Sequence, residues 1–300
     1  MRLVTFSLTT TEQCRLGMLA DEHTVIDLAA ALRDVIDIPA TLLGYIAAGP
    51  AFHAAVIRHV AAAPPWPATV RFGIQDLVLH APLRPGKIVG VGLNYVEHVE
   101  ESSRALDTDQ QRPERPVLFS KPATAVIGPN QPILHDSRLT AQLDWECELA
   151  AVIGSVAHAV DEDHALGHIF GYSIMNDISA RDQRRSGQWF FSKGQDSYAP
   201  FGPVVVTSDE IPDPHELTLS LDVNGEQRQH GNTRNMLFTI PELIADITSG
   251  MTLEPGDVIS TGSPQGVGAA MTPPTYLRPG DIVSAHIERI GTLSNPVKAV

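Results

Sequence analysis

Residues 143–154 read LDWECELAAVIG, and this stretch is the most informative part of the chain. Glu146 and Glu148 stand two positions apart, at the point where the sequence turns apolar and β-prone. Residues i and i+2 of a strand point to the same face, so the two carboxylates are predicted to lie side by side. Beside an apolar run they repel each other and lose hydration, and a hard divalent cation is the simplest compensation.

A third carboxylate, Asp177, ends another apolar, strand-like run at residues 171–177. Glu146, Glu148 and Asp177 together offer three oxygen ligands, with water or substrate in the remaining positions, which suits Mg²⁺ or Mn²⁺. The same spacing is also typical of two acids on the exposed face of an edge strand, with Asp177 as a capping residue in a loop. The spacing alone leaves both interpretations open.

Composition limits the class of protein. The chain has 300 residues, is 43% hydrophobic and carries a formal net charge of −14, which argues against nucleic acid and anionic membranes as partners. Cys14 and Cys147 are its only cysteines and form no C-x-x-C motif, which favours reduced thiols in the cytoplasm. We expect no signal peptide and no membrane span, because no apolar run approaches the roughly 18 residues that a span requires.

Strand and turn patterns predict two units, a small N-terminal α/β domain at residues 1–82 and a catalytic domain at residues 83–300. In the first, strands are predicted at 2–8, 15–20, 25–28 and 77–80, and helices at about 28–35 and 42–62. In the second, strands are predicted at 87–92, 116–119, 147–153, 169–175, 203–206, 217–223, 257–261 and 281–288, and helices at 95–104, 179–186 and 240–249. Many short strands with few helices indicate an α+β, β-rich fold whose core is rolled or barrel-like.

Three further features are candidates for chemistry. His98 and Glu101 have the i,i+3 spacing of one helix face, where the carboxylate raises the basicity of the imidazole, although a solvated helix face gives the same pattern. Lys193 follows an aromatic pair and precedes a glycine, as a lysine in a cleft or an ordinary surface lysine does. The turn TGSPQGVG at residues 261–268 predicts an anion cradle of backbone N–H groups, or simply a tight loop with positive φ.

Several enzyme classes are excluded by their missing motifs. The chain has no G-x-S-x-G nucleophile elbow and no Walker loop. The glycines at 90 and 92 lack the third glycine of a dinucleotide-binding fingerprint.

Taken in order, short motifs over about residues 84–297 resemble those of the fumarylacetoacetate hydrolase family. Each motif is weak alone, but their ordered co-occurrence is specific. They are GLNY at 92–95 with His98, FSKP at 119–122, DWECEL at 144–149, GY at 171–172 with NDISARD at 176–182, Lys193 with Asp196, PFGP at 200–203, VNGE at 223–226 and TGSPQGVG at 261–268.

The resemblance implies a rolled, barrel-like β core, a small N-terminal domain as in bacterial-type members, and a homodimer. It implies Mg²⁺, Mn²⁺ or Ca²⁺ held by Glu146, Glu148 and Asp177. It assigns His98 and Glu101 to a lid that orders over the substrate and activates water.

The resemblance also implies roles around the substrate. Lys193 would stabilise the developing enolate, and Ser263 would contact the substrate carboxylate or the oxygens bound to the metal. Tyr95, Gln183 and Arg184 are the other implied substrate contacts.

Two departures fall where the substrate would be recognised. Residues 181–184 read RDQR where members usually have Arg-Asp-apolar-Gln, so either Gln183 fills the glutamine's role or Arg184 replaces it. Residues 193–198 read KGQDSY where members often have KSFDTF, which alters the polarity of the pocket. The arginines at 181, 184 and 185 indicate a carboxylated substrate, with at least one of them serving at the surface.

The leading functional hypothesis is metal-dependent hydrolysis of a C–C bond in an acylpyruvate or related β-diketo acid, such as fumarylpyruvate or fumarylacetoacetate, in catabolism of aromatic or sugar-acid compounds. The first alternative is an isomerase, hydratase or decarboxylase of 2-oxo acids, acting on 2-hydroxyhepta-2,4-diene-1,7-dioate or oxaloacetate. The second alternative is a non-catalytic protein that binds a metal and a dicarboxylate.

Overall fold

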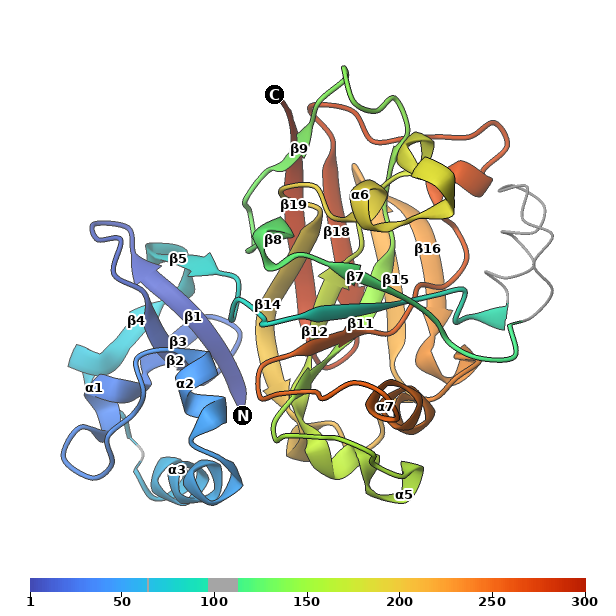
Figure 1. Cartoon of the computed structure of the whole chain (residues 1–300). Coiled ribbons are helices and arrows are strands. Elements are labelled where there is room, and N and C mark those ends of the chain that lie inside the picture. The colour runs from blue at the N-terminus through green and yellow to red at the C-terminus, as the bar shows by residue number, and fades with distance from the viewer. Residues whose placement is uncertain (64, 97–112) are drawn as a thin grey trace.

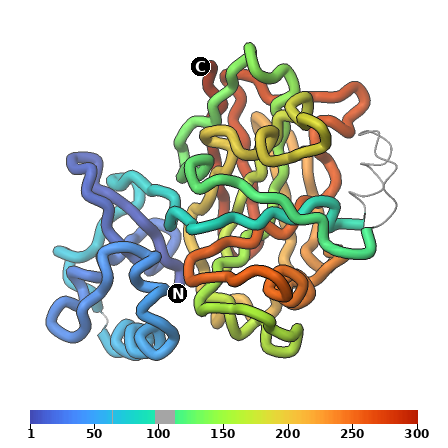
Figure 2. The backbone as a smooth tube through the Cα atoms, in the orientation of Figure 1, coloured from blue at the N-terminus to red at the C-terminus, as the bar shows by residue number. Residues whose placement is uncertain are grey.

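The computed structural model describes residues 1–63, 65–96 and 113–300 of the chain. Figure 1 and Figure 2 show a small N-terminal unit beside a larger, strand-rich core. The small unit contains β1 (Arg2–Leu8), β2 (Arg15–Leu19), β3 (Thr24–Asp27), α1 (Leu28–Leu32), α2 (Leu42–Ala47), α3 (Pro50–Ala62), β4 (Arg71–Gly73) and β5 (Leu77–His80).

The core combines short strands with three described helices. The strands are β6 (Ile88–Gly92), β7 (Val117–Lys121), β8 (Val126–Ile127), β9 (Ile133–His135), β10 (Leu143–Asp144), β11 (Cys147–Ile153), β12 (Ile169–Asn176), β13 (Ser179–Ala180), β14 (Ala199–Thr207), β15 (Thr218–Val223), β16 (Glu226–Asn232), β17 (Val258–Ser260), β18 (Ile282–Ile287) and β19 (Gly291–Ala299). The helices are α5 (Glu162–Ala165), α6 (Phe190–Lys193) and α7 (Ile240–Thr248).

Two large sheets organise the described residues. The first runs β4-β3-β2-β1-β14-β12-β11-β17-β6-β7, with β5 paired to β1 and β8 to β14, and the second runs β16-β15-β18-β19-β9. The N-terminal unit shares the first sheet with the core, because β1 pairs with β14 at Arg2 opposite Val206. The mixed α+β, strand-rich fold is as predicted, and the strand pairing among the described residues closes no barrel.

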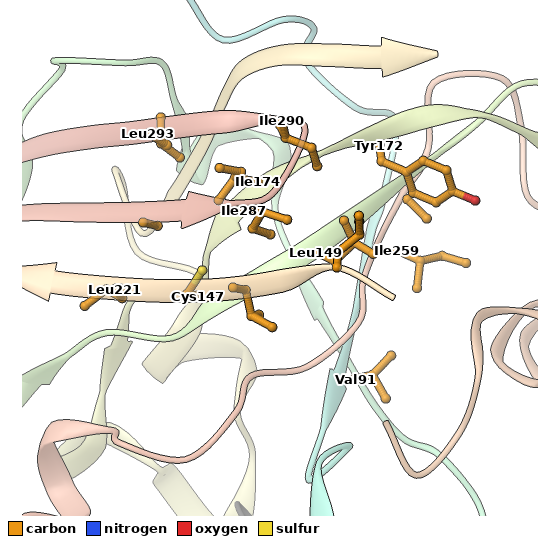
Figure 3. Close-up of a cluster of buried hydrophobic side chains, with 14 of the residues drawn as sticks. Val91, Cys147, Leu149, Tyr172, Ile174, Leu221, Ile259, Ile287, Ile290 and Leu293 are labelled. Carbon is orange, nitrogen blue, oxygen red and sulfur yellow. The ribbon is translucent and has the colours of Figure 1, made fainter. Parts of the chain in front are cut away.

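The core lies where the two sheets face each other. Leu149 and Ile174 from the first sheet pack with Leu221 and Ile287 from the second, as Figure 3 shows. β11 is buried along its whole length, because β12 and β17 flank it and the second sheet covers it. A strand buried on both faces tolerates the uninterrupted apolar run that the sequence has here.

Some sequence predictions need correction. The helix expected at 179–186 is instead β13 followed by two short 3₁₀ turns, of which the second contains Ser186 at φ 52°. The single helix expected at 42–62 is two helices, because Gly49 adopts φ 86° and Pro50 starts α3. Residues 97–104 of the helix predicted at 95–104 lie outside the described residues. Within the described ranges, no helix is both long enough and apolar enough to cross a bilayer.

The two cysteines differ in environment, which gives a direct test of this fold. Cys14 is exposed, whereas Cys147 is buried in β11, where burial and then the Glu148 carboxylate raise the pKa of its thiol. Because the thiolate is the reactive form, we expect a neutral alkylating reagent to modify only Cys14 in the folded protein and both cysteines in denaturant. A Cys14→Ser variant is the control, and rapid modification of Cys147 in that folded variant would contradict the packing of β11.

Candidate metal centre and active site

Three buried carboxylates meet at one end of the β11–β12 pair. Glu148 lies in β11, Glu146 immediately precedes that strand, and Asp177 immediately follows β12. Cys147 pairs with Asn176, so the next position along the ladder brings Glu146 opposite Asp177, whose N–H donates to the Glu146 carbonyl at 2.8 Å. One oxygen from each of the three carboxylates lies within 4.8 Å of the others. The structure therefore brings together the three residues predicted as metal ligands.

Lys193, at the end of α6, places its ammonium inside this cluster. Its Nζ donates to Glu146 Oε2 at 2.8 Å, to Ser179 Oγ at 2.9 Å and to Asp177 Oδ2. Burial by itself lowers the pKa of Lys193, but the carboxylates of Asp177 and Glu146 outweigh burial and the pKa is raised. Lys193 is therefore a buried cation that holds its proton, not the surface lysine of the alternative interpretation.

Two further cations hold the carboxylates in place. The fully buried Lys121, at the end of β7, donates to Asp177 Oδ1 and to the Ile178 carbonyl. Arg181 bridges Asp144 Oδ2 at 2.8 Å and Glu146 Oε1 at 2.6 Å. These side chains orient the cluster from the side of β7 and β13.

Asp144 anchors this frame through the backbone. Its carboxylate accepts hydrogen bonds from the N–H groups of Trp145 at 2.8 Å, Gly268 at 2.7 Å and Ala269 at 2.9 Å, besides the contact with Arg181. Four donors satisfy a carboxylate well, so its burial is compensated. Reasoning from the residues assigned no role to Asp144 or Lys121, although both lie in the motifs DWECEL and FSKP.

Glu148 differs from the other two ligands because no cation among the described residues contacts it. Ser260 Oγ donates to its Oε2 at 2.5 Å and the Gly262 N–H donates to the same oxygen at 3.2 Å, which leaves Oε1 for a metal ion. Burial first, and then the charges of Asp177 and Glu146, raise the pKa of Glu148 well above its ordinary value. Such a carboxylate is costly without a nearby cation.

The donor set fits a hard divalent cation. All candidate ligand atoms are carboxylate oxygens, and the neighbouring groups that could add ligands are hydroxyls and backbone carbonyls, without thiols or imidazoles among the described contacts. Mg²⁺, Mn²⁺ and Ca²⁺ prefer this set over softer ligands. The cluster would hold the metal, and Lys193 and Arg181 would share its carboxylates.

Arg184, one of the implied substrate contacts, is half-buried near the carboxylate cluster. Its guanidinium stacks 5.4 Å from the centroid of the Trp189 ring, and no carboxylate pairs with it in residues 1–63, 65–96 and 113–300. Burial and the positive charge of Arg181 lower its pKa. By contrast Arg185 is exposed and stacks 3.7 Å from the Phe191 centroid. A half-buried guanidinium beside the carboxylate cluster, with no carboxylate partner among the described residues, is suited to binding a carboxylate from outside the chain.

Other predicted substrate residues are engaged elsewhere. Gln183 donates its amide to the Leu139 carbonyl at 2.5 Å, so the described geometry does not bring it to the cluster. Ser263 is buried, and its hydroxyl accepts a hydrogen bond from Gln229 Nε2 at 2.7 Å. Tyr95 is buried and lines a polar cavity of about 300 Å³ with His230, among others.

The turn at 261–268 has both features that the sequence suggested. Gly262 and Gly266 adopt φ 94° and φ 101°, as a tight loop requires. The N–H groups of Gly262 and Gly268 donate to Glu148 and Asp144, so the turn binds anionic groups of the protein itself. His98 and Glu101, the predicted water-activating pair, lie outside the described residues.

Comparisons with known proteins give one consistent result. A family model described as fumarylacetoacetate (FAA) hydrolase C-terminal matches residues 87–298. The chain is 40% identical over 290 residues to oxaloacetate tautomerase YisK of Bacillus subtilis (strain 168), covering 94% of this chain and 95% of that protein.

Solved structures of the same kind align over the whole chain. The fumarylacetoacetate hydrolase of Exiguobacterium antarcticum is 36% identical with a TM-score of 0.83, and the alignment covers 100% of both chains. The 5-carboxymethyl-2-hydroxymuconate delta-isomerase of Mycobacterium smegmatis is 33% identical with a TM-score of 0.75, covering 100% of this chain and 99% of that one. Proteins with hydrolase and isomerase names therefore share this fold.

Proposed function

The chain belongs to the fumarylacetoacetate hydrolase family, and we propose that it is a divalent-metal-dependent enzyme that interconverts the enol and keto forms of a small 2-oxo dicarboxylate. A relative that matches this chain over nearly its full length is named an oxaloacetate tautomerase, and oxaloacetate is a substrate of the proposed class. C–C bond hydrolysis, the leading hypothesis from the sequence, becomes the second candidate.

The charge balance of the cluster carries the proposal. Four buried carboxylates, from Asp144, Glu146, Glu148 and Asp177, face three buried cations, from Lys121, Arg181 and Lys193. When all are ionised the cluster has one net negative charge, and a bound divalent cation would make it one net positive. The unpaired Arg184 adds a second positive charge. A site with two net positive charges favours a dianionic substrate over a neutral or monoanionic one.

A divalent cation bound here would polarise the 2-oxo group and favour its enolate form. In tautomerisation a proton leaves the enol oxygen and a proton is added at the adjacent carbon. Lys193, whose pKa is raised, keeps an ammonium in the cluster that donates a hydrogen bond to the enolate oxygen as negative charge develops. Arg184 binds the distal carboxylate and orients the substrate carbon chain.

Hydrolysis of an acylpyruvate is the second candidate because it needs the same enolate. Water adds to the acyl carbonyl, the C–C bond breaks, and pyruvate leaves as its enolate and is then protonated. The predicted pair His98 and Glu101 would activate that water. The full-length structural similarity to the Exiguobacterium protein, which is named a fumarylacetoacetate hydrolase, supports hydrolysis as the second candidate.

A spectrophotometric assay separates the candidates. Protein treated with EDTA is mixed with the enol form of oxaloacetate, or with acetylpyruvate, and the enol absorbance is followed before and after addition of Mg²⁺ or Mn²⁺. Metal-dependent loss of the oxaloacetate enol without pyruvate release supports tautomerisation, and release of pyruvate and acetate from acetylpyruvate supports hydrolysis. The metal alone is the blank, since free ions also promote enolisation. No acceleration on either substrate favours the non-catalytic binding protein.

Substitution of Arg184 tests the substrate class. We expect Arg184→Gln to raise the KM for oxaloacetate by about 10- to 100-fold, because a charge-assisted hydrogen bond to the distal carboxylate is lost. The KM for a monocarboxylate such as acetylpyruvate should change much less. Arg185→Gln, which removes the neighbouring exposed guanidinium, is the matched control. Equal effects of Arg184→Gln on both substrates would contradict the dicarboxylate preference.

The remaining predictions stay proposals. We propose Mg²⁺ or Mn²⁺ as the physiological metal, with Ca²⁺ a possible occupant, a homodimer as the assembly, and the cytoplasm as the location. We also propose that the chain is divided into a small N-terminal domain at residues 1–82 and a catalytic domain at residues 83–300.

A further inference from the structure

A second cavity lies between the N-terminal unit and the core, away from the acidic cluster. Its volume is about 490 Å³, and no member of the acidic cluster lines it. Its walls come from β1, β5, the start of α2, the segment that leads into β6, and the segment that follows β7, where the two units meet in Figure 1. A volume of this size is typical of sites for small organic molecules.

The lining combines an apolar wall with one unmatched positive charge. Leu42, Leu83 and Val126 supply apolar surface, and the one arginine is Arg84. Among the described residues, no aspartate or glutamate lines the cavity. Arg84 forms no ion pair within the part of the chain that the structure describes. Arg84 is exposed, and its guanidinium, which pairs with no carboxylate of the described residues, is available to an anion that enters the cavity.

The other polar groups of the cavity are neutral. His80 is hydrogen-bonded through Nε2 to Ser7 Oγ at 2.8 Å, and burial lowers its pKa, so its ring is uncharged at neutral pH. Thr41 and Gln131 offer hydroxyl and amide groups. The cavity therefore presents one formal charge, which matches a monoanion better than a dicarboxylate.

We propose that this cavity binds a small monocarboxylate with an apolar body, the carboxylate on Arg84 and the apolar part against Leu42, Leu83 and Val126, and that its occupancy is transmitted to the acidic cluster. The site is separate from the substrate site, which favours a dianion. It therefore has the character of a regulatory site.

One wall of the cavity leads directly to the cations of the cluster. Ala123 lines the cavity, and Pro122 alone separates it from Lys121, which holds Asp177. A Cβ placed on Gly194 would lie 2.7 Å from Cδ of Pro122, so the Pro122 ring packs tightly against the residue that follows Lys193. A shift of this wall would displace two of the buried lysines.

The opposite wall leads to Glu148. A Cβ placed on Gly256 would lie 2.3 Å from Cδ1 of Leu43, so this cavity residue packs against the turn that starts β17. β17 ends at Ser260, which donates to Glu148 at 2.5 Å. The cavity walls thus pack against the segments that carry Lys121, Lys193 and Ser260, which support the three carboxylate ligands.

The cavity offers its own reporter, because Cys14 is on its wall and is exposed whereas Cys147 is buried. The experiment uses the full-length protein with phenylacetate and benzoate as probes, and their amides as neutral controls. Binding is measured by calorimetry and by protection of Cys14 from iodoacetamide. We expect saturable binding with a Kd of roughly 1 mM, as is usual for so small a ligand. Bound ligand should also slow the alkylation of Cys14.

Two matched variants decide whether Arg84 is the anion site. Arg84→Gln should weaken binding by about tenfold or more, whereas Arg58→Gln, an exposed arginine on α3 outside the cavity, should leave it unchanged. Equal binding of the amides, unchanged binding in Arg84→Gln, or no saturation up to about 10 mM would overturn the binding site. Binding that disappears in Glu148→Gln but survives in Arg84→Gln would place the probes at the acidic cluster and also overturn it.

The transmission to the cluster has a separate readout. The affinity for Mn²⁺, followed by the electron paramagnetic resonance of free Mn²⁺, should change by about fivefold or more when phenylacetate saturates the cavity, and Mn²⁺ should change phenylacetate affinity by the same factor. Phenylacetate that binds with Arg84 but leaves the Mn²⁺ affinity unchanged would overturn transmission. None of these outcomes depends on turnover, so failure of the proposed catalytic function is distinguishable from failure of this site.

Discussion

Glu148→Gln is expected to abolish tight Mn²⁺ binding and metal-dependent turnover while leaving the protein folded. Glu148 is the ligand that no protein cation contacts, so its charge is the one most dependent on a bound metal. Residues that merely support a ligand typically change metal affinity by about 10- to 100-fold, so we expect loss of a ligand to cost more than about 100-fold. The affinity is measured by Mn²⁺ titration of EDTA-treated protein.

Stability separates this effect from misfolding. Glutamine keeps an oxygen that accepts from Ser260 and Gly262, and it removes a buried charge that repels Glu146 and Asp177. The free energy of unfolding of the metal-free variant should therefore equal or exceed that of the wild type. Glu162→Gln, on the exposed helix α5, is the control. Wild-type Mn²⁺ affinity in Glu148→Gln would remove Glu148 from the metal site.

Lys193→Met is expected to lower both the stability of the metal-free protein and the rate of turnover, but only stability should recover with metal. Without the ammonium, Glu146 and Asp177 lose the cation that they share, although Arg181 and Lys121 still contact them, and breaking a buried pair of this kind costs about 3–5 kcal/mol. Bound Mn²⁺ restores a positive charge to the same carboxylates, so the melting temperature should rise again. Turnover should stay about 10²- to 10⁴-fold below wild type, because the group that stabilises the enolate is gone.

The control for this variant is Lys298→Met, at an exposed position of β19. It removes the same charge without touching the cluster, and we expect wild-type stability and turnover. If Lys193→Met kept wild-type kcat with Mn²⁺ present, Lys193 would be a structural counter-ion alone. Differential scanning calorimetry and the enol assay together give both readouts.

The sequence predicted the elements that position the metal ligands more accurately than it predicted the edges of the sheets. The strand at residues 147–153 coincides with β11, because an apolar run this short and rich in small residues can be buried on both faces. The helix from Ile240 also has a strong local signal, in which Thr239 and Glu242 form a capping box before an apolar stripe. Local signals and the tertiary structure agree at these two elements.

Three strands of the second sheet, β9, β16 and β19, were not predicted, and the reasons differ for β16 and β19. β16 reads EQRQHGN and has no apolar alternation, but Asn224 and Gly225 at φ 55° and φ 79° form the tight hairpin turn that an Asn-Gly pair announces. That pair was a usable signal. β19 contains Asn295 and Pro296, which favour turns, and it stays extended because β18 and β9 pair with it on either side.

The site was predictable in its ligands but not in its support. Strand periodicity anticipates that Glu146 and Glu148 lie side by side, and Asp177 joins them because it follows β12, which pairs with β11. Lys121 and Arg181 reach the same carboxylates from β7 and the turn after β13, and no local pattern reports contacts between such distant segments. Asp144 and Lys121 therefore emerge as site residues only from the folded chain, and so does the role of Arg181 as a bridge between Asp144 and Glu146.

The most direct test of the account is a crystal structure of the protein with Mn²⁺, using the anomalous signal of the metal to locate it. On this account, we expect a strong peak with one oxygen from each of Glu146, Glu148 and Asp177 at about 2.1 Å, and Arg184 still without a carboxylate partner among the residues described here. A cluster that remains empty at saturating Mn²⁺, with Lys193 still bridging Glu146 and Asp177, or a Mn²⁺ peak bound by other residues, would contradict it.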